Sequence, residues 1–529
     1  MQIKKNFATY SWIFFIGLLL SSFSLLQPSF EGFDENAHFS RILDSSINYK
    51  TQFYDNGLMF GSLMRYPGSK YPGPESYASG KPPFGNFNTY DNFYQSQTNL
   101  GLIKYFKVDL TKMDHYGGNW QYQHPPLFYL FAGYINRQLN IDTLVLNVVL
   151  LRLFSILLVI IALIVCSKTM QIITLNLNFK ENTALNIGWI FSLCFPMFYF
   201  EFARIGNDSL VFLALSFVFY FSTKAYFSKN PKISILFMNL FLSIGLLTKA
   251  IVLPLVPIFI IYTFLLLIST NEKTTYLNFL FNFIKFCLLP LLIGLSWYFY
   301  SFIFLGNLGL GSEFQGINNL PDLISGLKEN LSLNNSVRGL FVPIISFIYA
   351  GSGSLVRPLV LTYILLSFIY FIFILYYFSY LRLRKFDFFS FIPFLLVLSL
   401  YLGLVHHTLI GIAQTGFGAS GGWYFYTLTP WILFILSISY QYLNILFIRA
   451  ILFFGFAILI KLYCLNILIF SGFATKSDNK YASMVTYDLD QIFFDTIARL
   501  NYVSYPTPAL ILFFSAFIFL FIRLKKMGN

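Results

Sequence analysis

The sequence predicts an all-α polytopic membrane protein with about twelve transmembrane helices and a long first extracytoplasmic loop. Three observations support this fold class. The 529 residues are 57% hydrophobic and only 11% charged, and the mean hydropathy is +0.66, which is unlike soluble globular chains. Apolar runs of about 20 residues recur along the chain, and a run of that length crosses a bilayer as a helix. Lysine and arginine gather after alternate runs, as the positive-inside rule expects.

The chain is expected to divide into two groups of spans and three outward loops. In order, the parts are the cytoplasmic N-terminus with the first transmembrane helix (1–26), the extracytoplasmic loop domain (27–142), helices 2–7 (143–305), the second outward loop (306–355) and helices 8–12 (356–529), the last with a third outward loop at 471–505. The segment 27–142 is too long for a linker and rich in glycine, proline, tyrosine and asparagine, so we expect a small domain there.

The predicted spans are the apolar runs that polar or basic residues bound. They cover 10–26, 143–166, 185–200, 209–227, 233–247, 251–269, 281–304, 356–380, 389–409, 424–446, 451–470 and 508–522. Lys4 and Lys5 precede the first run and no convincing cleavage site follows it, so we expect an uncleaved span with a cytoplasmic N-terminus. A short apolar piece at 341–349 is expected to be re-entrant or part of the second loop.

The charges distinguish the two sides of the membrane. The net charge of +13 does not indicate nucleic acid, because the basic residues lie at the expected cytoplasmic ends of spans. The acidic residues lie mostly on the opposite side. Of 22 Asp and Glu, only Glu181, Glu272 and Asp387 fall outside the predicted outward loops. A site made of carboxylates is therefore expected to face outward. The four cysteines lie in apolar runs and read as small core residues.

The stretch Gly32–Arg41, which reads G-F-D-E-N-A-H-F-S-R, is the first candidate site. Asp34 and Glu35 are adjacent carboxylates just beyond the first span. If a helix starts near Asp34, then Asp34, His38 and Arg41 fall at i, i+4 and i+7, on one face. The alternative is an ordinary acidic helix start, where carboxylates favour the helix dipole. The roles of His38 and Arg41 stay open between substrate contact and holding Asp34 in place.

A second candidate is Gln121–Leu130, Q-Y-Q-H-P-P-L-F-Y-L, directly before the second span. Two prolines after His124 restrict their own φ angles and the residue before them, which would hold the imidazole at the membrane surface. The alternative is a proline pair that ends a loop before a helix.

Charged residues beside apolar runs form a third group. Arg204 and Asp208 lie in A-R-I-G-N-D-S-L, and Lys249 lies in G-L-L-T-K-A with no acid near it in sequence. Ionisable groups at membrane depth cost roughly 3 kcal/mol each at mid-bilayer, so they are candidates for function. Arg204 and Asp208 can also simply pair with each other at i, i+4.

Arg357 and the pair His406-His407 complete this group. Adjacent side chains on a helix point about 100° apart, so the two histidines are poorly placed to share one ion. No cofactor is expected, and a divalent metal is the weaker alternative.

Outward carboxylates and cations at a bilayer surface suit a lipid-phosphate substrate such as a sugar linked to a polyprenyl phosphate. The phosphate is already a good leaving group, and Lys, Arg and His can neutralise the charge that develops on it. An acceptor hydroxyl needs a general base, and an Asp or Glu serves. One base without a second carboxylate nucleophile predicts direct displacement with inversion.

The string Phe33-Asp34-Glu35, followed by His38-Phe39, and the later His124-Pro125-Pro126-Leu127 resemble the protein O-mannosyltransferase family. More broadly they resemble the GT-C superfamily of membrane glycosyltransferases that use dolichyl- or polyprenyl-phosphate sugars. The Arg204–Asp208 junction and Gly245–Lys249 also look like recurring GT-C elements. The spacing between the first two motifs is longer than in typical protein mannosyltransferases, and no β-trefoil insert is seen, so the resemblance is drawn at the superfamily level.

The resemblance implies that Asp34 is the catalytic base and that Glu35 assists in positioning. The residues that it places toward the lipid phosphate or the substrate are His124, Lys249, Arg204, Arg41, His38 and Asp208. It implies a polyprenyl-phosphate-linked sugar as donor, the lipid bilayer as environment, and an acceptor that stays open between glycan, lipid and protein. The expected location is a bacterial inner membrane, with the site on the extracytoplasmic face.

Two other classes are weighed against this one. A multi-pass transporter or flippase of lipid-linked saccharides fits an even span count, but it should place polar groups along a path through the membrane, and here the acids avoid the spans. An O-antigen ligase or polymerase also uses lipid-linked glycans, but its long loop typically comes late in the chain, whereas here the longest loop is the first.

Overall fold

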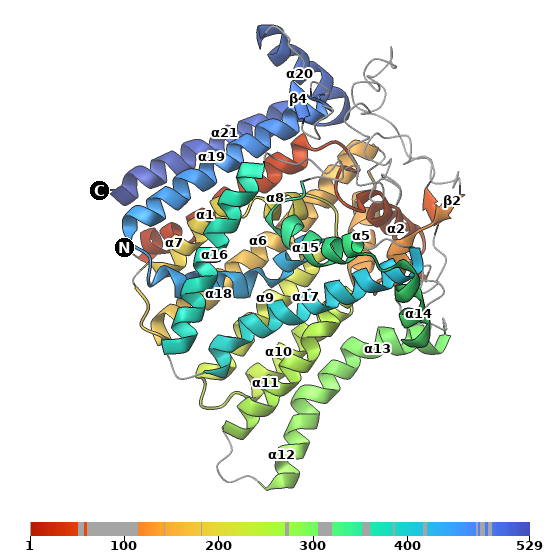
Figure 1. The fold of residues 1–529 in the computed structure, drawn as a ribbon, viewed down its shortest axis with the longest axis vertical. Coiled ribbons are helices and arrows are strands. Elements are labelled where there is room, and N and C mark those ends of the chain that lie inside the picture. The colour runs from red at the N-terminus through yellow and green to blue at the C-terminus, as the bar shows by residue number, and fades with distance from the viewer. Residues whose placement is uncertain are drawn as a thin grey trace.

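The computed structural model describes residues 2–50, 58–60, 115–141, 143–180, 182–269, 275–304, 320–351, 360–383, 387–415, 420–471, 474–476, 482–484 and 489–528. These residues form a helical bundle with helices projecting from both ends of its long axis (Figure 1). In this part of the chain, eight helices are long and apolar enough to cross a membrane. The chain is therefore a helical protein of the polytopic membrane type.

The first half of the bundle contains most of the elements that build the candidate site. They are α1 (Gln2–Leu26), α2 (Glu35–Ile47), the 3₁₀ helix η6 (Trp120–Gln123), α5 (Leu127–Leu139), α6 (Leu144–Asn176), α7 (Thr183–Cys194), α8 (Met197–Phe202), α9 (Asp208–Phe227), α10 (Lys232–Leu246), the 3₁₀ helix η7 (Ala250–Leu255) and α11 (Val256–Ser269). Strand β1 (Leu58–Phe60) pairs antiparallel with β2 (His115–Gly118).

The second half continues the bundle around the first. It contains α12 (Tyr276–Phe283), the π-helical turn η8 (Ile284–Leu288), α13 (Leu289–Phe304), α14 (Leu320–Asn330), α15 (Leu333–Ile348), α16 (Val360–Leu383), α17 (Phe388–Thr415), the 3₁₀ helix η9 (Gly422–Leu428), α18 (Thr429–Tyr440), α19 (Ile445–Phe470), α20 (Leu489–Val503) and α21 (Pro506–Gly528). Strands β3 (Ala474–Lys476) and β4 (Ala482–Met484) form a second antiparallel pair.

Some predicted spans differ from the helices. The predicted span 185–200 is broken between α7 and α8, where Pro196 lacks the N–H that a continuous helix needs. The predicted span 424–446 becomes the 3₁₀ helix η9 followed by the 12-residue α18. The helix α6 extends well past the predicted end at 166, to Asn176.

The predicted outward loops also contain regular structure. The segment 27–142 holds α2, η6 and α5, and α2 packs on α5 around Phe39, Leu43 and Phe128. The segment 306–355 holds α14 and α15, and these two helices meet at a bend of 120°. The apolar piece predicted at 341–349 forms the second half of α15.

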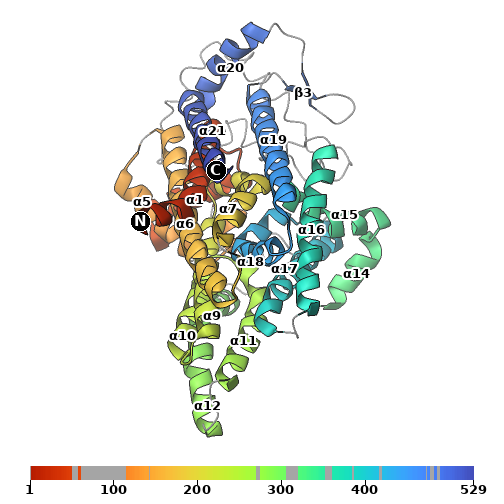
Figure 2. The ribbon, with the colours of Figure 1, turned by 90° about the vertical axis from the view of Figure 1, so that its left-hand side faces the viewer.

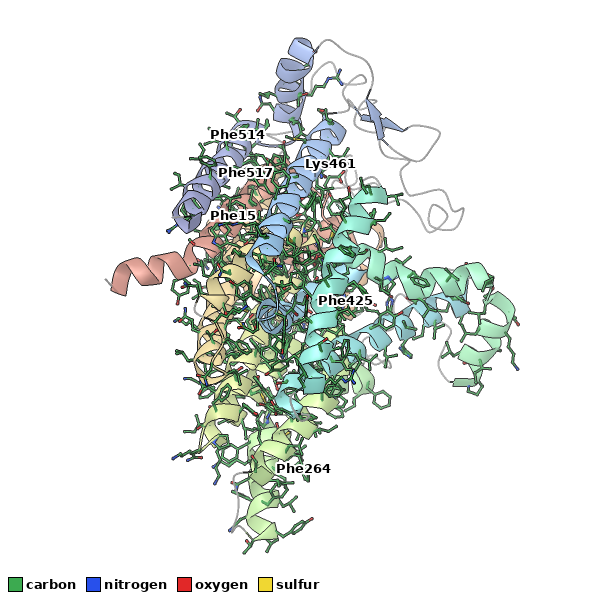
Figure 3. The ribbon with its side chains drawn as sticks, turned by 60° about the vertical axis from the view of Figure 1, so that its left-hand side comes forward. Phe15, Phe264, Phe425, Lys461, Phe514 and Phe517 are labelled. Atoms are coloured by element: carbon green, nitrogen blue, oxygen red, sulfur yellow. The ribbon has the colours of Figure 1, made fainter. Side chains whose placement is uncertain are left out.

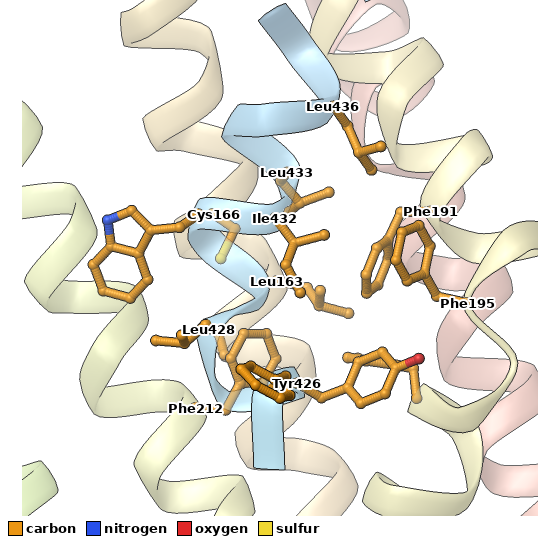
Figure 4. Close-up of a cluster of buried hydrophobic side chains, with 14 of the residues drawn as sticks. Leu163, Cys166, Phe191, Phe195, Phe212, Tyr426, Leu428, Ile432, Leu433 and Leu436 are labelled. Carbon is orange, nitrogen blue, oxygen red and sulfur yellow. The ribbon is translucent and has the colours of Figure 1, made fainter. Parts of the chain in front are cut away.

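The core is aromatic and lies around α18. Figure 4 shows Ile432, Leu433 and Leu436 of α18 among side chains of the surrounding helices, with Tyr426 of η9 below them. Phe195 stacks on Tyr370 with ring centroids 4.7 Å apart. Apolar side chains also cover the outer surface: Phe302 and Phe371 are exposed, and Figure 3 shows such side chains along the whole bundle. An apolar exterior of this extent suits a lipid environment.

The first and last helices lie side by side and run in opposite directions. The N–H of Tyr505, at the start of α21, donates to the carbonyl of Leu25, at the end of α1, over 2.9 Å. The hydroxyl of Ser22 donates to the carbonyl of Ala509 over 2.7 Å. The two chain ends consequently lie on the same side of the bundle (Figure 2). If both helices cross a membrane, the chain crosses it an even number of times.

Candidate functional site

Five segments that are far apart in the sequence meet in the structure. The guanidinium of Arg204 donates to the carbonyl of Phe33 over 2.8 Å. The N–H of Leu127 donates to the carbonyl of Leu247 over 3.2 Å, which joins the H-P-P-L and G-L-L-T-K strings. Phe33 also stacks on Trp423, with ring centroids 4.2 Å apart and planes only 4° apart. The structure therefore brings together the predicted motifs and a fifth segment, η9, that was not predicted.

Glu35 is completely enclosed by hydrogen-bond donors. Arg152 donates to both of its carboxylate oxygens, over 2.7 and 2.6 Å. The backbone N–H groups of Phe30, Gly32 and Ile205 donate to the same carboxylate over 2.9 to 3.3 Å. Glu35 has no exposed surface. These contacts fix the turn before α2. They leave no carboxylate surface of Glu35 for a substrate to contact.

Arg152 was missed by sequence reasoning. Besides Glu35, its guanidinium donates to the carbonyls of Ser24, Gln27 and Pro28 over 2.6 to 2.9 Å. All five guanidinium N–H groups thus have an acceptor, which is what a buried cation requires. A lone arginine inside the apolar run L-L-R-L-F was the available signal.

Asp34 is more accessible than its neighbour. It is half-buried and takes a left-handed conformation, with φ 56° and ψ 12°, immediately before α2. Such a conformation is uncommon outside glycine, and Asp is among the residues that tolerate it. Its carboxylate interacts electrostatically with Arg204, Tyr129 and Tyr424. The two adjacent carboxylates therefore differ: Glu35 is locked in the protein and Asp34 lies at the site.

His38 and Arg41 lie on one face of α2, as predicted, and both contact Tyr129. The Nδ1 atom of His38 is 2.8 Å from the Tyr129 hydroxyl, which in turn donates to Gln121 over 3.0 Å. The guanidinium carbon of Arg41 lies 3.9 Å from the centre of the Tyr129 ring. Arg41 also donates to the carbonyls of Gln121 and His124, the latter over 3.0 Å. These contacts tie α2 to the H-P-P-L turn.

The surroundings of His38 are strongly basic. Burial lowers its pKa well below the usual range, and the nearby basic residues lower it further; these are Arg204, Lys249, His124 and Arg41. The imidazole is therefore neutral at pH 7. Burial likewise raises the pKa of Tyr129, so its hydroxyl stays protonated. Basic side chains from four segments within range of one residue make a favourable place for an anion.

Arg204, Asp208 and Lys249 form a buried ion cluster with Glu201. The predicted pair of Arg204 with Asp208 is confirmed, at 3.3 Å. Arg204 also contacts Glu201 at 2.5 Å. Lys249 donates to both oxygens of Asp208 over 2.9 and 2.8 Å, and its Nζ lies 4.4 Å from the centre of the Tyr424 ring. Lys249 has no acid near it in sequence, but in space it is an ion-paired residue.

Glu201 was also missed, although E-F-A-R-I-G-N-D places four polar or charged residues close together. It is 2% exposed, and burial raises its pKa to about 8. Three buried atoms here have no hydrogen-bond partner among the described residues: Oε2 of Glu201, Nε of Arg204 and Oδ1 of Asn207. Unpaired buried polar atoms are costly, so their grouping in one place points to a polar ligand or to a shared proton.

Of the remaining candidates, the structure describes His406 and His407. Nδ1 of His407 is 3.0 Å from the Ser420 hydroxyl, and both His406 and His407 are exposed. Arg357 lies outside the described residues. Within the described ranges, no group of three or more His, Cys, Asp and Glu is arranged to hold a metal ion.

Comparison of the chain with family models, with curated proteins and with solved structures found no match. The chemistry of the site therefore has to be judged from its own residues.

Proposed function

We propose that the chain is an integral membrane glycosyltransferase of the GT-C type, which moves a sugar from a polyprenyl-phosphate donor to an acceptor hydroxyl with inversion. One observation carries the proposal. A half-buried carboxylate, Asp34, interacts electrostatically with Arg204, and Arg204 shares the carboxylate of Asp208 with Lys249. A base beside fixed cations is the combination that transfer from a phosphate leaving group requires.

In the proposed reaction, the acceptor hydroxyl loses its proton to Asp34 as its oxygen attacks the anomeric carbon. The bond from that carbon to the phosphate oxygen breaks, and the phosphate leaves with the bonding electrons. Arg204 and Lys249 stabilise the negative charge that develops on it. Glu35 takes no proton; with Arg152 it holds the turn that presents Asp34.

The proposal includes twelve spans with the site on the extracytoplasmic face of a bacterial inner membrane. The antiparallel contact of α1 with α21 supports an even number of crossings. Three apolar helices are shorter than the eight full-length ones, at Tyr10–Leu26, Thr183–Cys194 and Lys232–Leu246, and α18 has 12 residues, as many as Thr183–Cys194. The proposal of twelve spans requires that these four shorter helices cross the membrane together with the eight.

The test is transfer by the purified protein in lipid nanodiscs. The substrates are a panel of polyprenyl-phosphate hexoses and pentoses with labelled sugars, and a membrane extract supplies acceptors. Asp34→Asn is expected to lower transfer by at least about 100-fold, because it removes the base. The matched control is Asp495→Asn, which alters an exposed carboxylate on α20 and should transfer as the wild type does.

Two outcomes would count against the proposal. If Asp34→Asn transfers sugar at the wild-type rate, Asp34 is not the general base. If the wild type binds no polyprenyl-phosphate sugar, the protein is not a glycosyltransferase that uses such donors. Export of the intact lipid-linked sugar across a bilayer, without transfer, would favour the transporter alternative instead.

A further inference from the structure

Glu201 and Asp208 are two carboxyl groups that share one cation. The Nη2 atom of Arg204 contacts Oε1 of Glu201 at 2.5 Å and Oδ2 of Asp208 at 3.3 Å. The two carboxyl groups are also close enough to hydrogen bond with each other. Two ionised carboxylates cannot do so, because one of them must supply a proton. A second Glu201 oxygen, Oε2, is buried and has no partner among the described residues.

The charges that face Glu201 can be counted element by element. Arg204 follows α8, Asp208 begins α9 and Lys249 precedes η7, while η9 contributes the neutral hydroxyls of Tyr424 and Tyr426. The half-buried Asp34, which precedes α2, faces Arg204. Arg152 of α6 is already matched by Glu35. With Glu201 and Asp208 both ionised, the two carboxylates balance the two cations, but Oε2 of Glu201 is then a charged, buried atom without a donor among the described residues. With one proton added on Glu201, the cluster carries one positive charge, which an anion that binds beside it can balance.

We infer that Glu201 holds this proton, which it shares with Asp208, and that it acts as a positioning residue whose protonation keeps Arg204 and Lys249 available for the phosphate of the donor. The inference rests on the proposed function. A donor phosphodiester brings one further negative charge. The cluster accepts that charge when Glu201 is neutral and resists it when Glu201 is ionised. Binding of the anion is therefore linked to the protonation of Glu201.

The linkage has a definite sign. An anion that binds only the protonated form loses affinity as the pH rises above the pKa of the linked group, by tenfold per pH unit. Burial raises the pKa of Glu201 to about 8, so the loss falls in an accessible range. His38 and Tyr129 do not titrate there, because burial moves their pKa values out of it in opposite directions.

The first experiment measures binding of farnesyl methyl phosphate to the full chain in nanodiscs between about pH 6.5 and 9.5. This probe is a phosphodiester, so its own charge stays constant. The wild-type dissociation constant is expected to be flat at low pH and to rise about tenfold per pH unit above about 8. Glu201→Gln, which imitates the protonated acid, should keep the low-pH affinity across the whole range. Glu329→Gln, at an exposed position of α14, should keep the wild-type profile.

Two results would overturn the inference. One is a Glu201→Gln profile with the wild-type slope. The other is loss of binding by a monodisperse Glu201→Gln protein at every pH, which would show that the ionised carboxylate is needed.

A second measurement needs no ligand and separates this inference from the proposed function. Infrared difference spectra of the wild type minus Glu201→Gln, near pH 7, should contain the C=O stretch of a protonated carboxyl group. If that band is absent, the inference is wrong whatever the protein binds. If the band is present and the wild type binds no phosphodiester, the shared proton stands and the proposed function fails.

Discussion

Two buried ion clusters lie close together in this protein, and they differ in how completely they are satisfied. In the first, Arg152 and Glu35 use all their hydrogen-bonding groups on each other and on the backbone. In the second, Arg204 and Glu201 keep unpaired polar atoms among the described residues. A saturated cluster can only hold structure, whereas an unsaturated one can still bind a ligand or move a proton. The Arg152–Glu35 cluster therefore belongs to the scaffold, and the cluster of Arg204 and Glu201 belongs to the site.

The largest expected effect is on the saturated cluster. Arg152→Ala leaves Glu35 buried without its cation, and removing one partner of a buried pair costs about 3–5 kcal/mol. We expect a large fall in the thermal unfolding temperature of the protein in detergent. Replacing both residues by leucine should not restore it, because the carbonyls of Ser24, Gln27 and Pro28 stay without donors. Arg137→Ala, an exposed position on α5, is the control; equal stability of the two single variants would contradict the comparison.

The second cluster should respond in activity more than in stability. Lys249→Met removes one of the two cations at the proposed phosphate, and losing one such group typically costs about 100- to 1,000-fold in rate. Asp208 stays paired with Arg204, so the unfolding temperature should change less than in Arg152→Ala. The measurement is transfer rate beside thermal unfolding on the same preparations. A variant that unfolds but transfers normally when folded would place Lys249 in the scaffold.

A matched pair of glycines tests whether the position of Arg204 matters. A Cβ atom at Gly32 would lie 2.5 Å from the Cβ of Arg204, whereas one at Gly206 would meet the guanidinium at the end of that side chain, with Nη1 at 2.8 Å and Cζ at 3.3 Å. The side-chain tip can move aside and the Cβ cannot. Gly32→Ala should therefore cost about 1–3 kcal/mol and most of the transfer activity, and Gly206→Ala clearly less. If the two variants have indistinguishable unfolding temperatures and transfer rates, the position of Arg204 does not matter for stability or activity.

The smallest expected effect is a pH dependence of stability from His38. Its pKa in the folded protein is lowered, so below about pH 6.5 the unfolded chain binds more protons than the folded one. His38 therefore contributes stability at neutral pH that is lost on acidification, by at most about 1.4 kcal/mol per pH unit. The unfolding temperature of the wild type, relative to that of His38→Gln, should fall between about pH 6.5 and 5. A constant difference across that range would contradict a buried neutral imidazole.

Local patterns in the sequence predicted local features well. The apolar runs predicted the helices, the spacing of His38 and Arg41 predicted a shared helix face, and Arg204 and Asp208 pair as their i, i+4 separation allows. The features that were missed depend on contacts between distant segments. Glu35 is 117 residues from Arg152, and Lys249 is 41 residues from Asp208. Local sequence patterns carry no information about partners that are distant in the chain. Lys249 was therefore predicted to have no acidic neighbour.

The contact between the first and last helices has a consequence for biosynthesis. Ser22 and its acceptor Ala509 are 487 residues apart, and the end of α1 leads directly into the turn that carries Asp34. A ribosome adds about 5–20 residues per second, so α1 waits roughly half a minute or more for the helix that holds its end. During that interval a nascent chain has its earliest segment in the membrane without its final neighbour. Completion of the site is therefore coupled to completion of the chain.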